Sequence, residues 1–251
     1  SAPGAGVGLH KTGVLLDGQT IHVADVSVAA SNATPSSGGI VLLGSRGITA
    51  GALSVTQAHQ AHVYVANSSS GNVVLGALSA TGPDVASIAI RNQSGGVTVT
   101  GDATVAQTQP GSQFVSPANG LDVVADHVSL QGVTVSSVRA LQVQSPDGLI
   151  VNAVHGISIA GDVSVNANQA LISLHNSSGG AVVATGTLSA TGASFAAIRG
   201  DNTQGAIDIG QANVSQTANQ PAVATVSGAV EQGVFLQGDT ATLGGALVDI
   251  A

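Results

Sequence analysis

"NSSSGNVVLGALSATG", residues 67–82, occurs a second time almost unchanged as "NSSGGAVVATGTLSATG", residues 176–192. Both stretches combine Gly with alternating aliphatic and hydroxyl-bearing residues, and neither contains a charge. Alternation with a period of two predicts strands with one buried face, and Gly permits the positive φ that a sharp bend between strands requires. The repeated text therefore predicts the same corner and the same strand, built twice in a repetitive β structure.

Related stretches recur along most of the chain. Each begins with Gly, continues through a short alternating apolar run to a second Gly or Ala, and ends in another alternating run. Successive copies begin 24–28 residues apart, except for one interval of 36 residues, which places about half an extra repeat at 132–143. The copies are "GITAGALSV" from Gly47, "GNVVLGALSA" from Gly71, "GVTVTGDATV" from Gly96, "GLDVVADHVSL" from Gly120, "GISIAGDVSV" from Gly156, "GAVVATGTLSA" from Gly180, "GAIDIGQANV" from Gly205 and "GVFLQGDTATL" from Gly233.

A third apolar run completes each unit, as in "HVYVAN" at 62–67 and "LISLHN" at 171–176. One turn of three strands cannot bury its own apolar face, whereas turns stacked at the ~4.8 Å strand spacing share a core and pair their backbones in parallel sheets. The sequence therefore predicts an all-β protein, a single parallel β-helix of about nine rungs over residues 20–251. Parallel crossovers are right-handed as a rule, so we expect that hand. Residues 1–19 are expected to form a flexible N-terminal segment that contacts a neighbouring subunit.

The third run often ends in Asn, with Gly following within four residues. Equivalent corners of stacked rungs lie above one another, so their amide side chains can hydrogen-bond from rung to rung. We therefore predict a structural Asn ladder at Asn67, Asn92, Asn119, Asn176 and Asn202.

The composition excludes several partners. Five Lys and Arg residues against 13 Asp and Glu residues give a net charge of −8, so no basic stripe is present to neutralise nucleic-acid phosphates. No apolar run reaches the length of a membrane span, so membrane insertion is not expected. The chain has no Cys, which removes disulfides and thiolate metal sites. It starts with "SAPGAG", which is compatible with cleavage after small residues by a signal peptidase, and we expect a secreted protein.

Acidic and imidazole side chains are the candidate metal ligands of this chain. Five Asp residues are expected to share one corner position, and two of them, Asp102 and Asp126, fall on adjacent rungs and are the candidates for a calcium site. An exposed corner that tolerates Asp explains them better, so no metal or cofactor is expected. The imidazoles of "HQAH" at 59–62 and the scattered His residues are interpreted as solvated or packed at corners. The five Asp residues are Asp25, Asp102, Asp126, Asp162 and Asp239.

Catalysis is not expected. Polysaccharide-active β-helices need clustered carboxylates or a bound calcium ion with a nearby base, often in a cleft floored by aromatic side chains. This chain has one Tyr, three Phe and no Trp. Ice binding requires a flat, regular Thr array, and pairs such as Thr98 and Thr100 do not repeat regularly.

Short Gly-punctuated strands such as "GDVSV", "GTLSATG" and "GALSATG" resemble the passenger regions of secreted bacterial adhesins of the filamentous haemagglutinin type and of autotransporter β-helices. The resemblance extends over residues 20–251 and implies an extracellular or cell-surface role in adhesion, matrix or filament formation.

The ends of the predicted rod suggest self-assembly. The segment "GGALVDIA", 244–251, reads as an apolar strand without a cap, and exposed strand edges recruit further strands. We expect a secreted structural subunit that stacks head to tail with itself into a filament or matrix fibre. The alternatives are an adhesin segment that binds host cells, neighbouring cells or polysaccharide, a piece of a longer β-helix, a capped monomer and, less favoured, a polysaccharide-active enzyme.

Overall fold

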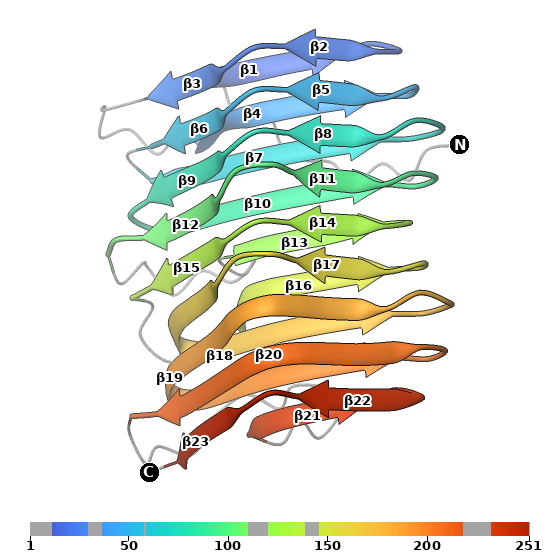
Figure 1. The fold of residues 1–251 in the computed structure, drawn as a ribbon. Coiled ribbons are helices and arrows are strands. Elements are labelled where there is room, and N and C mark those ends of the chain that lie inside the picture. The colour runs from blue at the N-terminus through green and yellow to red at the C-terminus, as the bar shows by residue number, and fades with distance from the viewer. Residues whose placement is uncertain are drawn as a thin grey trace.

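A computed structural model of the chain describes residues 12–29, 37–57, 59–109, 120–138, 146–217 and 232–250. Within these ranges every regular element is a β-strand, and the strand pairs are parallel. The strands wind into successive coils, and each coil contributes to three faces (Figure 1). The predicted all-β parallel β-helix is confirmed.

We name the three faces sheet 1, sheet 2 and sheet 3, in the order in which the chain visits them. Sheet 1 contains β1 (Thr12–Asp17), β4 (Ser37–Gly44), β7 (Gln60–Asn67), β10 (Val85–Asn92), β13 (Gly120–Ala125), β16 (Asp147–Ala153), the ends of β18 (Val163–Asn176) and β19 (Val182–Asn202), and β21 (Gly233–Gln237). Sheet 2 contains β2 (Ile21–Val23), β5 (Ile48–Ala50), β8 (Val73–Leu75), β11 (Val97–Val99), β14 (Val128–Leu130), β17 (Ile157–Ile159), the starts of β19 and β20 (Ala206–Gln216), and β22 (Thr240–Leu243). Sheet 3 contains β3 (Val26–Ala29), β6 (Leu53–Thr56), β9 (Leu78–Gly82), β12 (Ala103–Gln107), β15 (Val133–Ser137), the start of β18, the middle of β19, the end of β20, and β23 (Ala246–Ile250).

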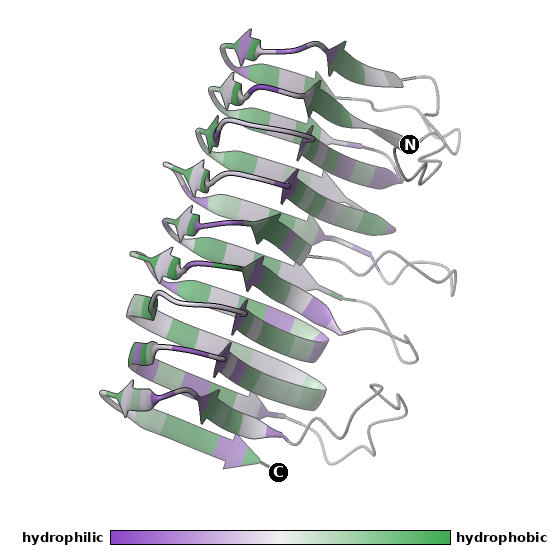
Figure 2. Cartoon of the chain, turned by 90° about the vertical axis from the view of Figure 1, so that its right-hand side faces the viewer, coloured by the Kyte–Doolittle hydropathy of each residue, from purple (hydrophilic) through white to green (hydrophobic). Residues whose placement is uncertain are grey.

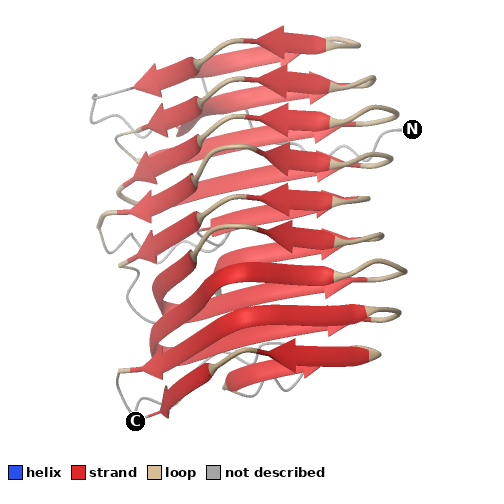
Figure 3. Cartoon of the chain, viewed as in Figure 1, coloured by secondary structure: helices blue, strands red, loops and turns tan. Residues whose placement is uncertain are grey.

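The pairings of sheet 1 run in order through β1, β4, β7, β10, β13, β16, β18, β19 and β21, which makes nine levels. At the strand spacing of ~4.8 Å, nine levels give a rod on the order of 40 Å long. Short links connect sheet 2 to its neighbours at the corners (Figure 3). The first coil starts with β1, so residues 12–19, assigned from the sequence to a flexible segment, include a strand of the solenoid.

The core consists of side chains that repeat the same inward position at each level. One column of sheet 1, whose members are at most 1% exposed, is formed by Ile40, Val63, Ile88, Leu121, Leu149, Ile172 and Ile198. Hydrophobic and hydrophilic residues alternate along the strands (Figure 2). Because burial of one Val, Leu or Ile side chain contributes about 1.5–3 kcal/mol, these columns are the main stabilising feature of the rod.

The predicted repeat pattern is wrong in two copies. Gly120 and Gly233 begin β13 and β21 of sheet 1 and do not form the corner that precedes sheet 2. In those coils the register places His127 and Asp239 at that corner. Strands of all three sheets alternate with the same period of two, so alternation alone cannot assign a run to a sheet.

The predicted half repeat at 132–143 is also wrong in its described part, residues 132–138. Its first part forms β15, which pairs residue by residue with β12 and β18 as an ordinary strand of sheet 3. The longer coils instead contain the stretches 110–119, 139–145 and 218–231, which lie outside the described residues.

Two corner glycines explain why Gly recurs at the same place in the two similar stretches, 67–82 and 176–192. Gly71 and Gly180 have φ angles of +90° and +100°. A Cβ atom on Gly71 would lie 2.2 Å from the carbonyl oxygen of Arg46, and one on Gly180 would lie 2.0 Å from that of His155. Each corner therefore requires Gly both for its left-handed backbone and for the close approach of the previous coil.

We predict that Gly180→Ala destabilises the chain by about 1–3 kcal/mol, because alanine is strained at this φ and clashes with the backbone of the coil below. The neighbouring substitution Gly179→Ala is the matched control, because a Cβ there meets nothing within 4 Å. Urea denaturation followed by circular dichroism should place the midpoint of Gly180→Ala well below that of Gly179→Ala. Equal midpoints would contradict the assigned corner geometry.

Candidate functional site

Buried asparagines occupy the corner between sheet 1 and sheet 2. Nδ2 of Asn67 donates a hydrogen bond to Oδ1 of Asn92 in the next coil at 3.0 Å. Oδ1 of Asn67 accepts from the backbone N–H of Gly47, and its Nδ2 also donates to the carbonyls of Ser70 and Gly71. One side chain thus ties the corner of its own coil to the coils on both sides.

The same bond between amides of successive coils recurs four coils later. Nδ2 of Asn176 donates to Oδ1 of Asn202 at 3.0 Å, and all four amides are at most 2% exposed. Between the two pairs the equivalent positions are Ala125 and Ala153, so the ladder consists of two separate segments. Asn119 lies outside the described residues, and the ladder position of that coil is Ala125. These contacts are structural: of the four ladder amides, only Oδ1 of Asn176 has no hydrogen-bond partner among the described residues.

We predict that Asn67→Ala lowers the free energy of unfolding by about 1–3 kcal/mol, because it leaves the buried Gly47 N–H and the Asn92 oxygen without their partner. Asn152→Ala is the control, since Asn152 points outward from sheet 1 and its replacement should change stability by less than about 0.5 kcal/mol. Urea titrations of the two variants provide the measurement, and equal destabilisation would show that the ladder contributes nothing specific.

Aspartates cap the corner between sheet 2 and sheet 3. The carboxylates of Asp25, Asp102 and Asp162 accept hydrogen bonds from the backbone N–H groups one coil further on. The donor–acceptor distances are 2.7 Å from Ala52, 3.0 Å from Gly132 and 2.8 Å from Thr187. Each carboxylate therefore connects two coils and satisfies a corner N–H group.

Asp126 and Asp239 do not share this corner, contrary to the sequence analysis. Both lie between sheet 1 and sheet 2, because the runs that precede them belong to sheet 1. Asp102 and Asp126 thus occupy different corners and have different partners, and the structure does not form the calcium site considered for them.

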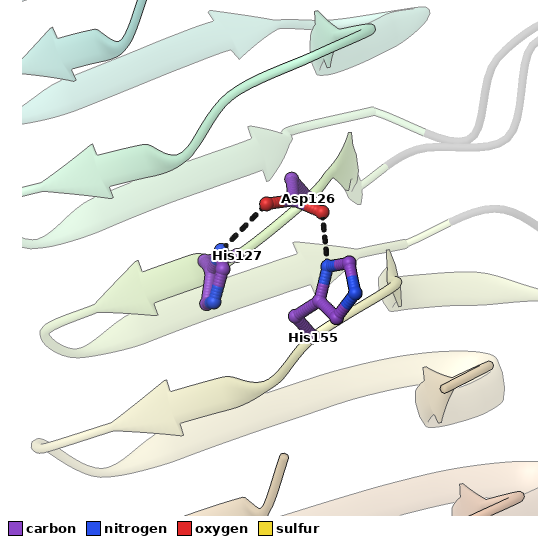
Figure 4. A group of neighbouring side chains, drawn as sticks. All are labelled: Asp126, His127 and His155. Carbon is purple, nitrogen blue, oxygen red and sulfur yellow. Dashed lines mark hydrogen bonds and ion pairs between the residues drawn. The ribbon is translucent and has the colours of Figure 1, made fainter. Parts of the chain in front are cut away.

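Asp126 instead belongs to a cluster with two imidazoles (Figure 4). Asp126 and His127 form the corner between β13 and β14, and His155 projects from the equivalent corner of the next coil. Nδ1 of His127 lies 2.9 Å from Oδ2 of Asp126, and Nδ1 of His155 hydrogen-bonds to Oδ1 of the same carboxylate. The two rings stack with their centroids 5.5 Å apart and their planes inclined by 26°.

The electrostatics of this cluster favour an ionised carboxylate. The hydrogen bond with His155, and the charges that His155 and His127 carry when protonated, hold the pKa of Asp126 below its ordinary value, while slight burial acts in the opposite direction. The side chains of Asp126, His127 and His155 are 32%, 60% and 50% exposed, so solvent and ions can reach the cluster. One oxygen or nitrogen atom from each side chain lies within 4.8 Å of the others.

Other imidazoles have simpler surroundings. His59 lies 2.9 Å from Asp84, His175 lies 3.3 Å from Asp201, and Nδ1 of His62 lies 2.7 Å from the Ser87 hydroxyl. Burial lowers the pKa of His62 below its ordinary value. The cluster was not predicted from the sequence, because the run before Asp126 was assigned to the wrong sheet. With the correct assignment, "ADH" at 125–127 and "AVH" at 153–155 follow equivalent strands of sheet 1.

Sheet 3 carries a hydroxyl array, made mostly of Ser and Thr side chains, that was also not predicted from the sequence. Two outward-facing columns run along the first eight coils, and neither contains a charged residue. The first column is Ser27, Ser54, Ser79, Thr104, Thr134, Ser164, Ser189 and Asn213. The second is Ala29, Thr56, Thr81, Ala106, Ser136, Asn166, Thr191 and Ser215.

Comparisons of the chain with protein-family models, with curated proteins and with solved structures found no match. The likeness to haemagglutinin-type and autotransporter adhesins accordingly stays an expectation drawn from the sequence. Among the residues that the structure describes, no helix is long and apolar enough to cross a membrane.

Proposed function

We propose that this chain is a secreted, non-enzymatic structural protein that stacks head to tail with further copies into an extracellular filament or matrix fibre. The observation that carries the proposal is the state of the last described coil, β21–β23. Each of its strands pairs on one side only among the described residues, with β19 or β20. A parallel strand from a second copy of the chain can pair with the other side of this coil.

The apolar positions of this coil support the same proposal. Val248 continues an inward-facing column, and it is 48% exposed whereas Val214, its partner one level earlier, is 1% exposed. Ile250 is 43% exposed, and its partner Gln216 is 5% exposed. A further coil stacked on β23 would remove these side chains from water, and burial of apolar surface stabilises such a contact.

The first coil is the complementary surface. Its strands β1, β2 and β3 pair with β4, β5 and β6 on one side among the described residues. Its inward-facing Val26 and Val28 are partly buried, whereas their partners Leu53 and Val55 are fully buried. Both end coils have the same order of three parallel strands, so one can continue the other. Such a contact does not close on itself and generates a fibre.

We predict that the purified chain forms fibres with an axial repeat on the order of 40 Å, from nine levels at the strand spacing. Val248→Lys should raise the critical concentration for assembly at least about tenfold, because it places a charge in the apolar joint, a cost of about 1.4 kcal/mol or more. Negative-stain electron microscopy and sedimentation at several protein concentrations provide the measurement.

Leu247→Lys is the matched control. Leu247 is adjacent to Val248 but points outward, opposite Asn213, so this substitution should leave assembly unchanged. A chain that stays monomeric at high concentration, or one whose assembly is equally sensitive to both substitutions, would overturn the proposed joint.

The hydroxyl array of sheet 3 favours a second function, adhesion to cell surfaces or polysaccharide. Hydroxyl groups both donate and accept hydrogen bonds, and an uncharged surface of this kind is chemically matched to polymers rich in hydroxyl groups. The repeat of ~4.8 Å along each column would let many weak contacts act together on an extended ligand. No observation on the described residues specifically favours a polysaccharide-active enzyme.

For this second function we predict that the chain co-sediments with insoluble polysaccharide and that Ser79→Glu combined with Thr134→Glu abolishes the association. The carboxylates would interrupt the uncharged array and add desolvation cost. Ser158→Glu, on the outward face of sheet 2, is the control and should retain binding. Equal loss in both variants would indicate nonspecific charge repulsion and would contradict a role for sheet 3.

A further inference from the structure

We propose that Asp126, His127 and His155 form a binding site for a divalent transition-metal ion of the Zn²⁺ class, which joins two neighbouring coils at their corner. The site lies within one chain, so the proposal does not depend on filament assembly. It also differs from the calcium site considered for Asp102 and Asp126, both in its position and in its ligand atoms.

The geometry of the ligand atoms is the first argument. Zinc binds His nitrogen at about 2.0–2.1 Å and carboxylate oxygen at about 2.0–2.2 Å, so ligand atoms in a tetrahedral shell lie about 3.3 Å apart. Nδ1 of His127 and Oδ2 of Asp126 are 2.9 Å apart, and the three candidate ligand atoms lie within 4.8 Å of one another. The three side chains are 32–60% exposed, which leaves them room to rotate toward a shared ion.

The chemistry of the ligand set is the second argument. Imidazole nitrogen suits zinc, copper and nickel, whereas calcium and magnesium require shells composed of oxygen ligands. Two imidazoles and one carboxylate therefore select a transition metal over calcium. Three protein ligands leave at least one coordination position for water, and the exposure of the side chains gives that water free access.

Ordinary ion pairing accounts for the other His–Asp contacts, in which one carboxylate meets one imidazole. His59 with Asp84 and His175 with Asp201 are of this type. In the cluster both oxygens of a single carboxylate are directed at nitrogens from two different coils. The bound ion would link residues 126 and 127 to residue 155, and binding to the folded state would raise the stability of these coils by mass action.

The test is calorimetric titration of the whole chain with zinc chloride at pH 7.5, together with NMR spectra of the imidazole groups. We expect one ion per chain, with selective shifts of the His127 and His155 resonances. His127→Ala and His155→Ala should each weaken binding at least about tenfold, since even outer-shell substitutions cost 10–100-fold. His175→Ala is the matched control and should bind zinc as the unsubstituted chain does.

Three results would overturn the proposal. These are undiminished zinc binding by the double variant His127→Ala/His155→Ala, unchanged His127 and His155 resonances at millimolar zinc, and displacement of zinc by equimolar calcium. The substituted side chains are exposed, and unchanged circular dichroism spectra would establish that the variants fold. Copper(II) provides a second probe, because its electron paramagnetic resonance spectrum would report two coordinating nitrogens.

Discussion

The in-register parallel pairing of each coil with the next is the constraint on which the rest of the structure depends. Every inward column, hydroxyl column and corner contact exists because equivalent residues of successive coils lie directly above one another. Since a slip of one residue would turn each apolar side chain from the core to the surface, the register must be strongly specified. Contacts at the corners specify it. The side chains of Asn67 and Asn176 each donate a hydrogen bond to the side-chain amide of the next coil, and Asp25, Asp102 and Asp162 accept one from a backbone N–H of the next coil. Gly71 and Gly180 allow the backbone of the previous coil to approach closely.

The fold class could be predicted from the sequence because alternation and Gly spacing are local properties. The Asn pairs were predictable for the same reason, since "NSSSG" and "NSSGG" each mark the end of a strand and the following corner. The assignment of strands to sheets was not predictable, because all three sheets alternate alike. That ambiguity led to Gly120 being taken for a corner and to Asp126 being paired with Asp102 in place of His155. Contacts between residues 29 positions apart, across a coil of unusual length, depend on the register and cannot be derived from local pattern.

The three sheets differ in what they present to solvent, although they share one core. Sheet 1 bears ionic contacts between coils, such as those of Arg91 with Asp122 and of His175 with Asp201, whereas the two outward columns of sheet 3 are uncharged through the first eight coils. Inward positions are restricted by packing, so variation in chemistry is confined to the outward positions. One rod can therefore carry different chemistry on its end coils, its faces and its corners without a conflict in the core.

The lengths of the links between sheets are unequal. Some strands, such as β19, pass from one sheet to the next without a break, so only links between separate strands are compared. Links from sheet 1 to sheet 2 contain two to five residues, and those from sheet 2 to sheet 3 contain two or three. Links from sheet 3 to sheet 1 range from two residues to sixteen. Most of the length variation thus lies along one longitudinal edge of the rod. Insertions or deletions there leave the rise per coil and the twofold alternation of every strand intact. This edge is consequently where evolution, or protein engineering, can add foreign peptides at intervals along the solenoid while its architecture is retained.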